Sequence, residues 1–319
     1  MEQAETLKRA RSPALDDILG KKFPILDQGF IRVIDYMGND EAIAQAARNS
    51  YGKGTKHVST TEVLIRYLMR KRHTTPVEMN ELKLQIMVPM DCWRQWIRHR
   101  TASVNEYSTR YSEAIDATAR TLPGEWRIQA VGNKQGSDGF VDLATGEELS
   151  REETELLNHM RGVYQNRLGK DVAREQARKD LTLSTYTVAY WKINLHNLFH
   201  FLGLRMAPDA QLEIRDPATV IGEKIVAPWV PIAWQAFLDY RLNSMSLSAL
   251  DIKALQALQQ YQADLKLTGF GHPQDPVVYK LQELGWFTAS GHPKKKCREL
   301  KEFEAKAERL GLQVPWIKE

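Results

Sequence analysis

The sequence has few cysteines, and it lacks the long apolar segments and glycine-rich loops that mark several large classes of protein. Its 319 residues include only Cys92 and Cys297, which have neither a disulfide framework nor a zinc-ligand spacing and so favour a reducing cytoplasm. No apolar run reaches the roughly eighteen residues of a membrane span. Residues 1–20 mix acidic with basic side chains and lack the apolar core of a signal peptide. We therefore expect a cytoplasmic protein that does not enter membranes.

Glycine-rich phosphate loops are absent as well. Neither GxxxxGK[S/T] nor GxGxxG occurs, so a flavin or nicotinamide, if bound, would lie outside a P-loop or Rossmann fold. The net charge of +4 is too small to indicate nucleic acid by itself and suits an anionic small molecule. Hydrophobic residues make up 43% of the chain and charged residues 26%, which excludes wholesale disorder.

Composition divides the chain into three regions. Residues 1–22 are a polar leader for which we expect low order, and residues 23–241 hold the apolar periodicities and the chemically suggestive clusters. Residues 242–319 shift to Lys, Glu, Gln, Leu and Ala, which predicts a helical C-terminal extension of unknown role. A helical decoration is a simpler interpretation of this extension than a regulatory module.

Hydrophobic patterning predicts strands and helices within the central region. β-branched residues favour a strand over residues 29–37, and strict alternation predicts a half-buried strand over residues 82–88. Asp40 can cap the short helix that follows the first strand, because its carboxylate can accept from free amides. Glycines indicate a long, partly hairpin-like connection over residues 113–150, and an apolar run indicates a largely buried helix over residues 181–205. Further helices are expected after a capping box at 59–62, over 156–169, from 210 to 225 and over 232–240.

The densest cluster of chemical groups spans residues 93–111. Arginines, a histidine, a carboxylate and a serine alternate there with tryptophans and tyrosines, a mixture that a purely solvated face would rarely show. Arginine presents forked donors to phosphate, and aromatic rings present flat surfaces to a heterocycle. We favour a nucleotide or phosphate site over a structural ion-pair network. RNA binding is a weaker alternative, because the basic residues do not form a long stripe.

A second cluster ends at Arg205. On a continuous helix Asn194 and Arg205 share one face, and His196 and His200 share another. The sequence does not decide whether these two histidines are hydrogen-bonded core or interface residues or whether they bind a ligand. A zinc site is disfavoured because no HExxH pattern or cysteine pair accompanies them, and we expect no bound metal.

The first cluster also carries a family signature. Arg98-His99-Arg100, followed after seven residues by Ser108, resembles the signature of the flavin-dependent thymidylate synthases. Similar motifs occur in order along residues 25–240, which makes the resemblance specific. They are Met37-Gly38-Asn39-Asp40, Ala46-Ala47-Arg48-Asn49-Ser50, His73-Thr74-Thr75-Pro76-Val77-Glu78, Arg178, the stretch from Asn194 to Arg205, and Ala210-Gln211-Leu212-Glu213-Ile214.

This resemblance implies an α+β fold, in which a twisted, mainly antiparallel sheet packs against helices, with a long helical second half and a non-Rossmann flavin site. It implies an enzyme that converts dUMP to dTMP, with methylenetetrahydrofolate as carbon donor and NADPH as reductant through FAD. It also implies a homotetramer whose active sites lie between subunits, with residues 23–241 as the catalytic domain and no nucleic acid as partner. The alternative function is RNA binding or a flavin/folate-dependent RNA methyltransferase.

By motif position, the resemblance implies which residues contact each ligand. The expected dUMP contacts are Gln95, Trp96, Ile97, Arg98, Glu106, Tyr107, Ser108, Thr109, Arg110, Arg178 and Arg205. The expected FAD contacts are Thr75, Arg98, His99, Arg100, Glu106, Asn194, Leu195, His196 and His200.

Arg205 is the expected catalytic residue. It matches the family arginine that lies against the uracil ring, where a guanidinium would stabilise negative charge at N3 and O4. C5 then becomes more nucleophilic without a covalent enzyme intermediate. Cys92 lacks the Pro-Cys-His context of ordinary thymidylate synthases, so we expect a structural thiol. Ser108 has no evident His-Asp pair to activate it, so we expect it to position the ligand.

Overall fold

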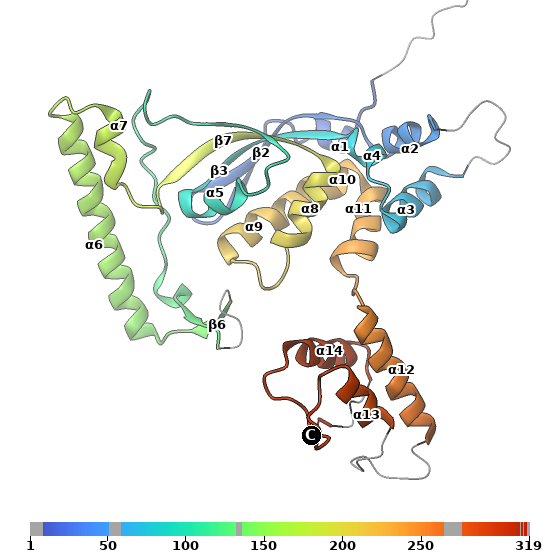
Figure 1. Ribbon diagram of the computed structural model, residues 1–319. Coiled ribbons are helices and arrows are strands. Elements are labelled where there is room, and N and C mark those ends of the chain that lie inside the picture. Colours follow the sequence, from blue (N-terminus) through green and yellow to red (C-terminus); the bar gives the residue numbers. More distant parts are fainter. Residues whose placement is uncertain are drawn as a thin grey trace, which may run out of the picture. The chain divides into compact units, whose positions relative to one another are not determined.

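The computed structural model describes residues 9–50, 59–131, 136–264, 276–312, 314, 316 and 317. The chain folds into two compact units, Met1–Asn243 and Ser244–Glu319 (Figure 1). The second unit begins close to the start expected for the C-terminal extension. No helix of the described residues is long and apolar enough to cross a membrane.

A five-stranded sheet forms the centre of the first unit. Its strand order is β1-β2-β3-β7-β4, and every neighbouring pair is antiparallel. The antiparallel sheet and the many helices confirm the expected α+β class. The strands are β1 (Lys22–Ile25), β2 (Gly29–Met37), β3 (Glu81–Pro89), β7 (Tyr186–Asn194) and β4 (Ser103–Glu106), and a separate hairpin pairs β5 (Arg127–Gln129) with β6 (Ser137–Phe140).

One face of the sheet is buried under helices. Along β3, Leu82 and Leu84 are fully buried, whereas the side chains that alternate with them stay partly accessible, as expected of a strand with one face on the core. Three helices contact these strands: α5 (Met90–Trp96), α8 (Leu195–Arg205) and α9 (Leu212–Val220). Helices α8 and α9 also pack against each other below the sheet in Figure 1.

Further helices complete the first unit. They are α1 (Pro13–Asp16), α2 (Asp40–Arg48), α3 (Thr61–Lys71), α4 (Thr75–Glu78), α6 (Leu143–Leu168), α7 (Arg174–Ala177), α10 (Ala227–Trp229) and α11 (Pro231–Phe237). Short 3₁₀ turns occur at Pro123–Glu125 and Arg178–Asp180, and π turns occur at Ile221–Val226 and Leu238–Leu242.

Large aromatic side chains fill the core between the sheet and α8. Trp96, Trp191 and Phe201 are fully buried, and their ring centroids lie 4.7–5.3 Å apart. Such tilted and edge-to-face pairs stabilise a core beyond the burial of their area. Because Trp96 is the last residue of α5, this cluster fixes the point from which the arginine-rich loop leaves the helix.

The Gly38-Asn39-Asp40 motif connects β2 to α2 and also contacts the start of α11. Gly38 has a φ of +88°, and a side chain there would also collide with a neighbouring amide. Asn39 is the residue that caps α2. The Asp40 carboxylate accepts instead from the backbone amides of Ile232 and Ala233 at the start of α11, at 2.9 and 3.0 Å. The role expected for Asp40 at its own helix is therefore wrong, and it caps a helix far along the chain.

The helix expected over residues 181–205 is wrong in its first half. Tyr186–Asn194 form β7, the strand between β3 and β4, and α8 begins only at Leu195. Most side chains of β7 are buried or partly buried, so its sequence is a nearly continuous apolar run. Periodicity alone cannot separate such a central strand from a buried helix.

Two regions expected to be irregular contain ordered structure. Helix α6 begins at Leu143, inside the connection expected over residues 113–150. Gly146 serves close packing and not a turn, because a Cβ there would collide with the carbonyl oxygen of Pro123. In the leader, Leu15 of α1 is buried in the core, so the expectation of low order is wrong for residues 9–22. Residues 1–8 lie outside the described part of the chain.

The second unit has a hydrophobic core of its own. It contains α12 (Ala249–Asp264), α13 (Pro276–Glu283) and α14 (Arg298–Arg309). Trp286 and Phe303 are buried at its centre, with ring centroids 5.3 Å apart. These contacts give the unit a basis for folding that does not depend on the central sheet of the first unit.

Candidate active site

The two sequence clusters meet at Arg205 and His99. Arg205 is the last residue of α8, and His99 lies in the loop that follows α5. The Nε–H group of Arg205 donates a hydrogen bond to Nε2 of His99 at 3.1 Å. The packing of Trp96 on Phe201 brings the ends of these two helices together.

His99 is partly buried among other rings. Its ring centroid lies 4.9 Å from that of Phe201 and 5.8 Å from that of His200. Burial, and then the charges of Arg205 and His200, lower the pKa of His99 to about 4. His99 is therefore neutral near neutral pH, and its Nε2 lone pair is available to Arg205.

Arg205 has donors that its neighbours leave free. Burial lowers the pKa of its guanidinium, which still stays charged at neutral pH. Within the described residues, the only hydrogen bond of this side chain is the one from Nε to His99, and it forms no ion pair. Its two terminal nitrogens can therefore bind an electron-rich edge of a ligand.

Another group of expected residues gathers where β4 leaves the sheet. The hydroxyl of Thr187 on β7 donates to the Glu106 carboxylate at 2.8 Å, and the amide of Tyr107 donates to a carbonyl of β7, also at 2.8 Å. The chain then turns, and the Ser108 hydroxyl accepts from the amide of Arg110 at 3.3 Å. The sheet thus fixes the start of this segment, and a local turn shapes its end.

Arg178 and Arg110 bring positive charge to the same segment. Arg178, in the turn after α7, donates to the hydroxyl of Thr109. Arg110 forms an ion pair with Glu175 at 3.4 Å, and both side chains are more than half exposed. Exposed pairs of this kind contribute little to stability, so a phosphate could replace Glu175 as the partner of Arg110.

Some residues of the site have partners that the sequence did not reveal. The side-chain amide of Gln95 donates to Gln211, the residue immediately before α9. Thr187 holds Glu106, and Glu175 faces Arg110. The only feature of the sequence that could have indicated a role for Gln211 in the site is its place in one of the family motifs.

Two expected contacts can reach a ligand only through their backbone. The side chains of Trp96 and Leu195 are fully buried in the hydrophobic core. In contrast, Ile97 and Tyr107 are exposed, as are the arginines Arg98 and Arg100. The loop after α5 thus presents two guanidinium groups to solvent, on either side of His99.

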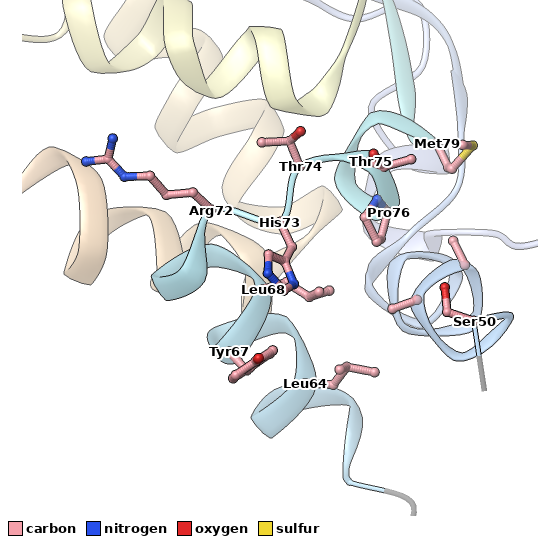
Figure 2. Close-up of a pocket in the computed structure, with 12 residues that line it drawn as sticks. Ser50, Leu64, Tyr67, Leu68, Arg72, His73, Thr74, Thr75, Pro76 and Met79 are labelled. Carbon is pink, nitrogen blue, oxygen red and sulfur yellow. The ribbon is translucent and has the colours of Figure 1, made fainter. Parts of the chain in front are cut away.

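A cavity of about 700 Å³ lies beside Thr75. Its walls come from α2, α3 and the segment 72–79, and Figure 2 shows Ser50, Thr74 and Thr75 among the polar groups around it. The ring of His73 stands edge-on to that of Tyr67 at 5.6 Å. Ligand pockets commonly have volumes of about 300–1,000 Å³, so this cavity has room for a small molecule or part of a larger one.

The remaining expected flavin contacts lie on α8 or at its start. Asn194 caps this helix by accepting from the amide of Asn197 at 2.9 Å. His196 is partly buried, and burial lowers its pKa despite the opposing charge of Glu78. Because α4 packs against α8, the helix of Thr75 lies beside the helix of His196 and His200.

The parts of the expected site are not all joined. Within the described residues, no hydrogen bond or ion pair links Arg205 to the segment 106–110.

Cys92 lies apart from these groups in the hydrophobic core. It is fully buried, its thiol donates to the carbonyl of Glu213 at 3.1 Å, and burial raises the pKa of the thiol. This environment opposes thiolate formation and agrees with a structural thiol. The described residues contain no group of His, Cys, Asp and Glu suited to holding a metal ion.

Comparison with known proteins places most of this chain within one family. Residues 32–232 match a family model described as thymidylate synthase complementing protein. A flavin-dependent thymidylate synthase of Wolbachia pipientis wMel is 46% identical over 254 residues, which cover 80% of this chain and 89% of that protein. One from Thermus thermophilus is 48% identical over 255 residues, covering 78% and 91%.

Solved structures show a similar fold. The UMP/dUMP methylase PolB from Streptomyces cacaoi, bound with 5-Br UMP, superimposes with a TM-score of 0.61 at 31% identity. That match covers 67% of this chain and 96% of the other. The same enzyme bound with 5-Br dUMP gives a TM-score of 0.61 at 30% identity and covers 69% and 99%.

Proposed function

Because this chain belongs to the flavin-dependent thymidylate synthase family, we propose that it methylates dUMP to dTMP with Arg205 as the group that activates the uracil. The carbon donor is methylenetetrahydrofolate, and NADPH is the reductant through FAD. The observation that carries this assignment is the partly buried Arg205, which is held by His99 and whose terminal nitrogens have no partner among the described residues.

Arg205 acts on the charge of the pyrimidine. A guanidinium against N3 and O4 stabilises the negative charge that builds up there, and this charge makes C5 a better nucleophile. A partly buried cation is more effective in this role than an exposed one, since solvent screens it less. No enzyme nucleophile is needed, which agrees with the buried thiol of Cys92.

The segment 106–110 binds the other end of the nucleotide. Arg110 and Arg178 supply donors to the phosphate, with the Ser108 hydroxyl and the Gln95 amide as neutral partners. Arg178 already contacts Thr109, and Gln95 is held by Gln211. Glu106, positioned by Thr187, lies between the nucleotide and the flavin.

The residues assigned to FAD suit such a ligand. The cavity beside Thr75 offers hydroxyls and an imidazole, and the loop after α5 offers Arg98 and Arg100 to a diphosphate. Asn194, His196 and His200 lie along the helix that packs on α4. When bound, the flavin supplies the redox chemistry that passes electrons from NADPH to the product. We therefore propose that the flavin binds here without a Rossmann fold.

We also propose that the site is shared between subunits of a homotetramer. Two observations support this arrangement. In the described part of the chain no hydrogen bond or ion pair joins Arg205 to the segment 106–110. That segment also contains the exposed Tyr107, and Tyr111 just beyond it is 79% exposed. Exposed aromatic residues beside a free edge strand are typical of surfaces that another chain covers.

The test of the activity is an absorbance spectrum of the purified protein followed by addition of dUMP. A yellow protein whose flavin bands change on dUMP addition, and which forms dTMP from methylenetetrahydrofolate and NADPH, is the expected result. A colourless protein with salt-sensitive affinity for RNA would instead favour the RNA-directed alternative.

The shared site is tested by mixing two defective chains. Arg110→Ala damages the phosphate contact in every site of its homotetramer, and Arg205→Ala damages the uracil contact in every site. If the two residues reach one dUMP from different subunits, co-expressed chains form some sites in which both arginines are intact. The mixed tetramers should then be more active than either parent. If co-purified tetramers show no gain, both residues come from one chain.

A further inference from the structure

The hydrogen bond between Arg205 and His99 restrains the orientation of the Arg205 guanidinium as well as its distance from the imidazole. Arg205 donates through Nε and not through a terminal nitrogen. Because the guanidinium is planar, a hydrogen bond at Nε restricts the rotation of the whole group and favours one direction for the two Nη groups. The side chain is long and flexible when unrestrained, and this single contact removes much of its freedom.

The same bond defines the state of the histidine. Arg205 has only donors, so Nε2 of His99 must be an acceptor, and the neutral ring carries its proton on Nδ1. Phe201 packs edge-on against the ring and limits its rotation. Protonating His99 would place a second cation beside the guanidinium and break the bond. The arrangement therefore works only while His99 is neutral.

From this geometry we infer that His99 is a positioning residue for Arg205, which aims the guanidinium at the uracil. The inference rests on the proposed function and assigns His99 a role in the nucleotide half of the site, in addition to its expected contact with FAD. The alternative is that His99 contacts only the flavin, in which case its loss should affect flavin binding or reduction and leave Arg205 unchanged.

Two substitutions separate these roles. His99→Leu keeps a similar volume and removes the acceptor. His99→Gln places an amide oxygen near the position of Nε2, so it can still accept from Arg205. His292→Leu, at an exposed histidine of the second unit, is the matched control. Each variant is tested for flavin content, for bleaching of the flavin absorbance by NADPH without dUMP, and for release of tritium from C5 of labelled dUMP.

We expect His99→Leu to slow tritium release and turnover about ten- to a hundredfold, the range for one hydrogen bond to a charged group, with a smaller change in KM for dUMP. Any change in flavin content or in bleaching by NADPH should be much smaller than the loss of tritium release, because the contact with FAD is shared with other residues. His99→Gln should recover most of the lost rate. The control should behave as wild type.

A double-mutant cycle gives the deciding outcome. If His99 acts through Arg205, adding His99→Leu to Arg205→Ala should cause little further loss. Independent, multiplying losses would overturn the inference, and so would a His99→Gln variant as slow as His99→Leu. Should His99→Leu fail to fold or to hold flavin, His99→Asn replaces it in the cycle with Arg205→Ala, because the shorter amide removes the acceptor at the position of Nε2 and stays polar. A wild-type protein without flavin or tritium release would refute the proposed function itself, which is a separate result.

Discussion

Each compact unit of this chain contains a buried or partly buried charge, Asp251 in the second and Arg205 in the first, and these two charges differ in how completely they are paired. In the second unit the carboxylate of Asp251 accepts from Lys306 and from the amide and hydroxyl of Ser248, all at 2.7 Å. In the first unit Arg205 uses one donor on His99, and no other described residue accepts from its remaining donors. Buried polar groups are normally satisfied, so an incompletely paired cation indicates a ligand, and a completely paired one indicates a structural role.

The comparison predicts the largest loss of activity at Arg205. Arg205→Ala should reduce turnover about a hundred- to a thousandfold, the usual cost of one preorganised electrostatic donor, while the protein still holds flavin. The matched variant is Arg298→Ala in the second unit, where the arginine is exposed and paired with Glu302. Steady-state rates and the flavin spectrum measure both variants. Turnover near wild type in Arg205→Ala would contradict the assignment.

The separate cores predict separate effects on stability. Trp286 is buried in the second unit, and Trp286→Ala should lower the free energy of unfolding of that unit by about 3–5 kcal/mol. Activity should persist at temperatures where the second unit has unfolded. Trp191→Ala in the sheet of the first unit should cause a similar loss of stability together with a loss of activity.

Calorimetry combined with activity after heating distinguishes these cases. Two transitions that respond separately to the two tryptophan variants are expected. A single transition that both variants shift by the same amount would show that the units unfold together, and the comparison between them would then fail.

A smaller effect is expected at Ser108. Its hydroxyl is assigned to binding, so Ser108→Ala should raise the KM for dUMP about three- to tenfold and change kcat less, the range for one neutral hydrogen bond. The measurement is the dependence of turnover on dUMP concentration. A covalent adduct between Ser108 and the nucleotide, detected by mass spectrometry, would overturn this role.

The elements of the fold that have a clear local pattern of apolar and polar residues could be predicted from the sequence. The strands over 29–37 and 82–88 follow from β-branched content and strict alternation, and both are present. The strand β7 was missed because partly or fully exposed positions such as Val188 and Tyr190 carry apolar or aromatic residues, so its sequence does not alternate between apolar and polar residues. The edge strand β1 was missed because it has four residues, one of them Pro24.

The site was predictable only through the family motifs. Spacing along the chain could suggest that arginines and aromatic residues form a nucleotide site, but it could not pair Arg205 with His99, which come from separate elements. It also could not distinguish the core side chain of Trp96 from the exposed Arg98, two residues later. Tertiary packing decides both matters, and a single sequence does not encode it as a local signal.

The smallest effect should come from removing the second unit altogether. The family match ends at residue 232, and the core of the first unit is completed by residues up to Leu242. A chain that ends at Asn243 therefore keeps every assigned ligand contact, and its turnover and flavin content should stay within about twofold of the full chain, as for changes away from a site. Full-length Trp286→Ala is the matched control, because it disrupts the second unit and retains its residues. If the shortened protein is soluble and binds flavin yet has lost turnover, the second unit contributes to the active site, and the pairing of a buried charge such as Asp251 is not a sufficient sign of a structural role.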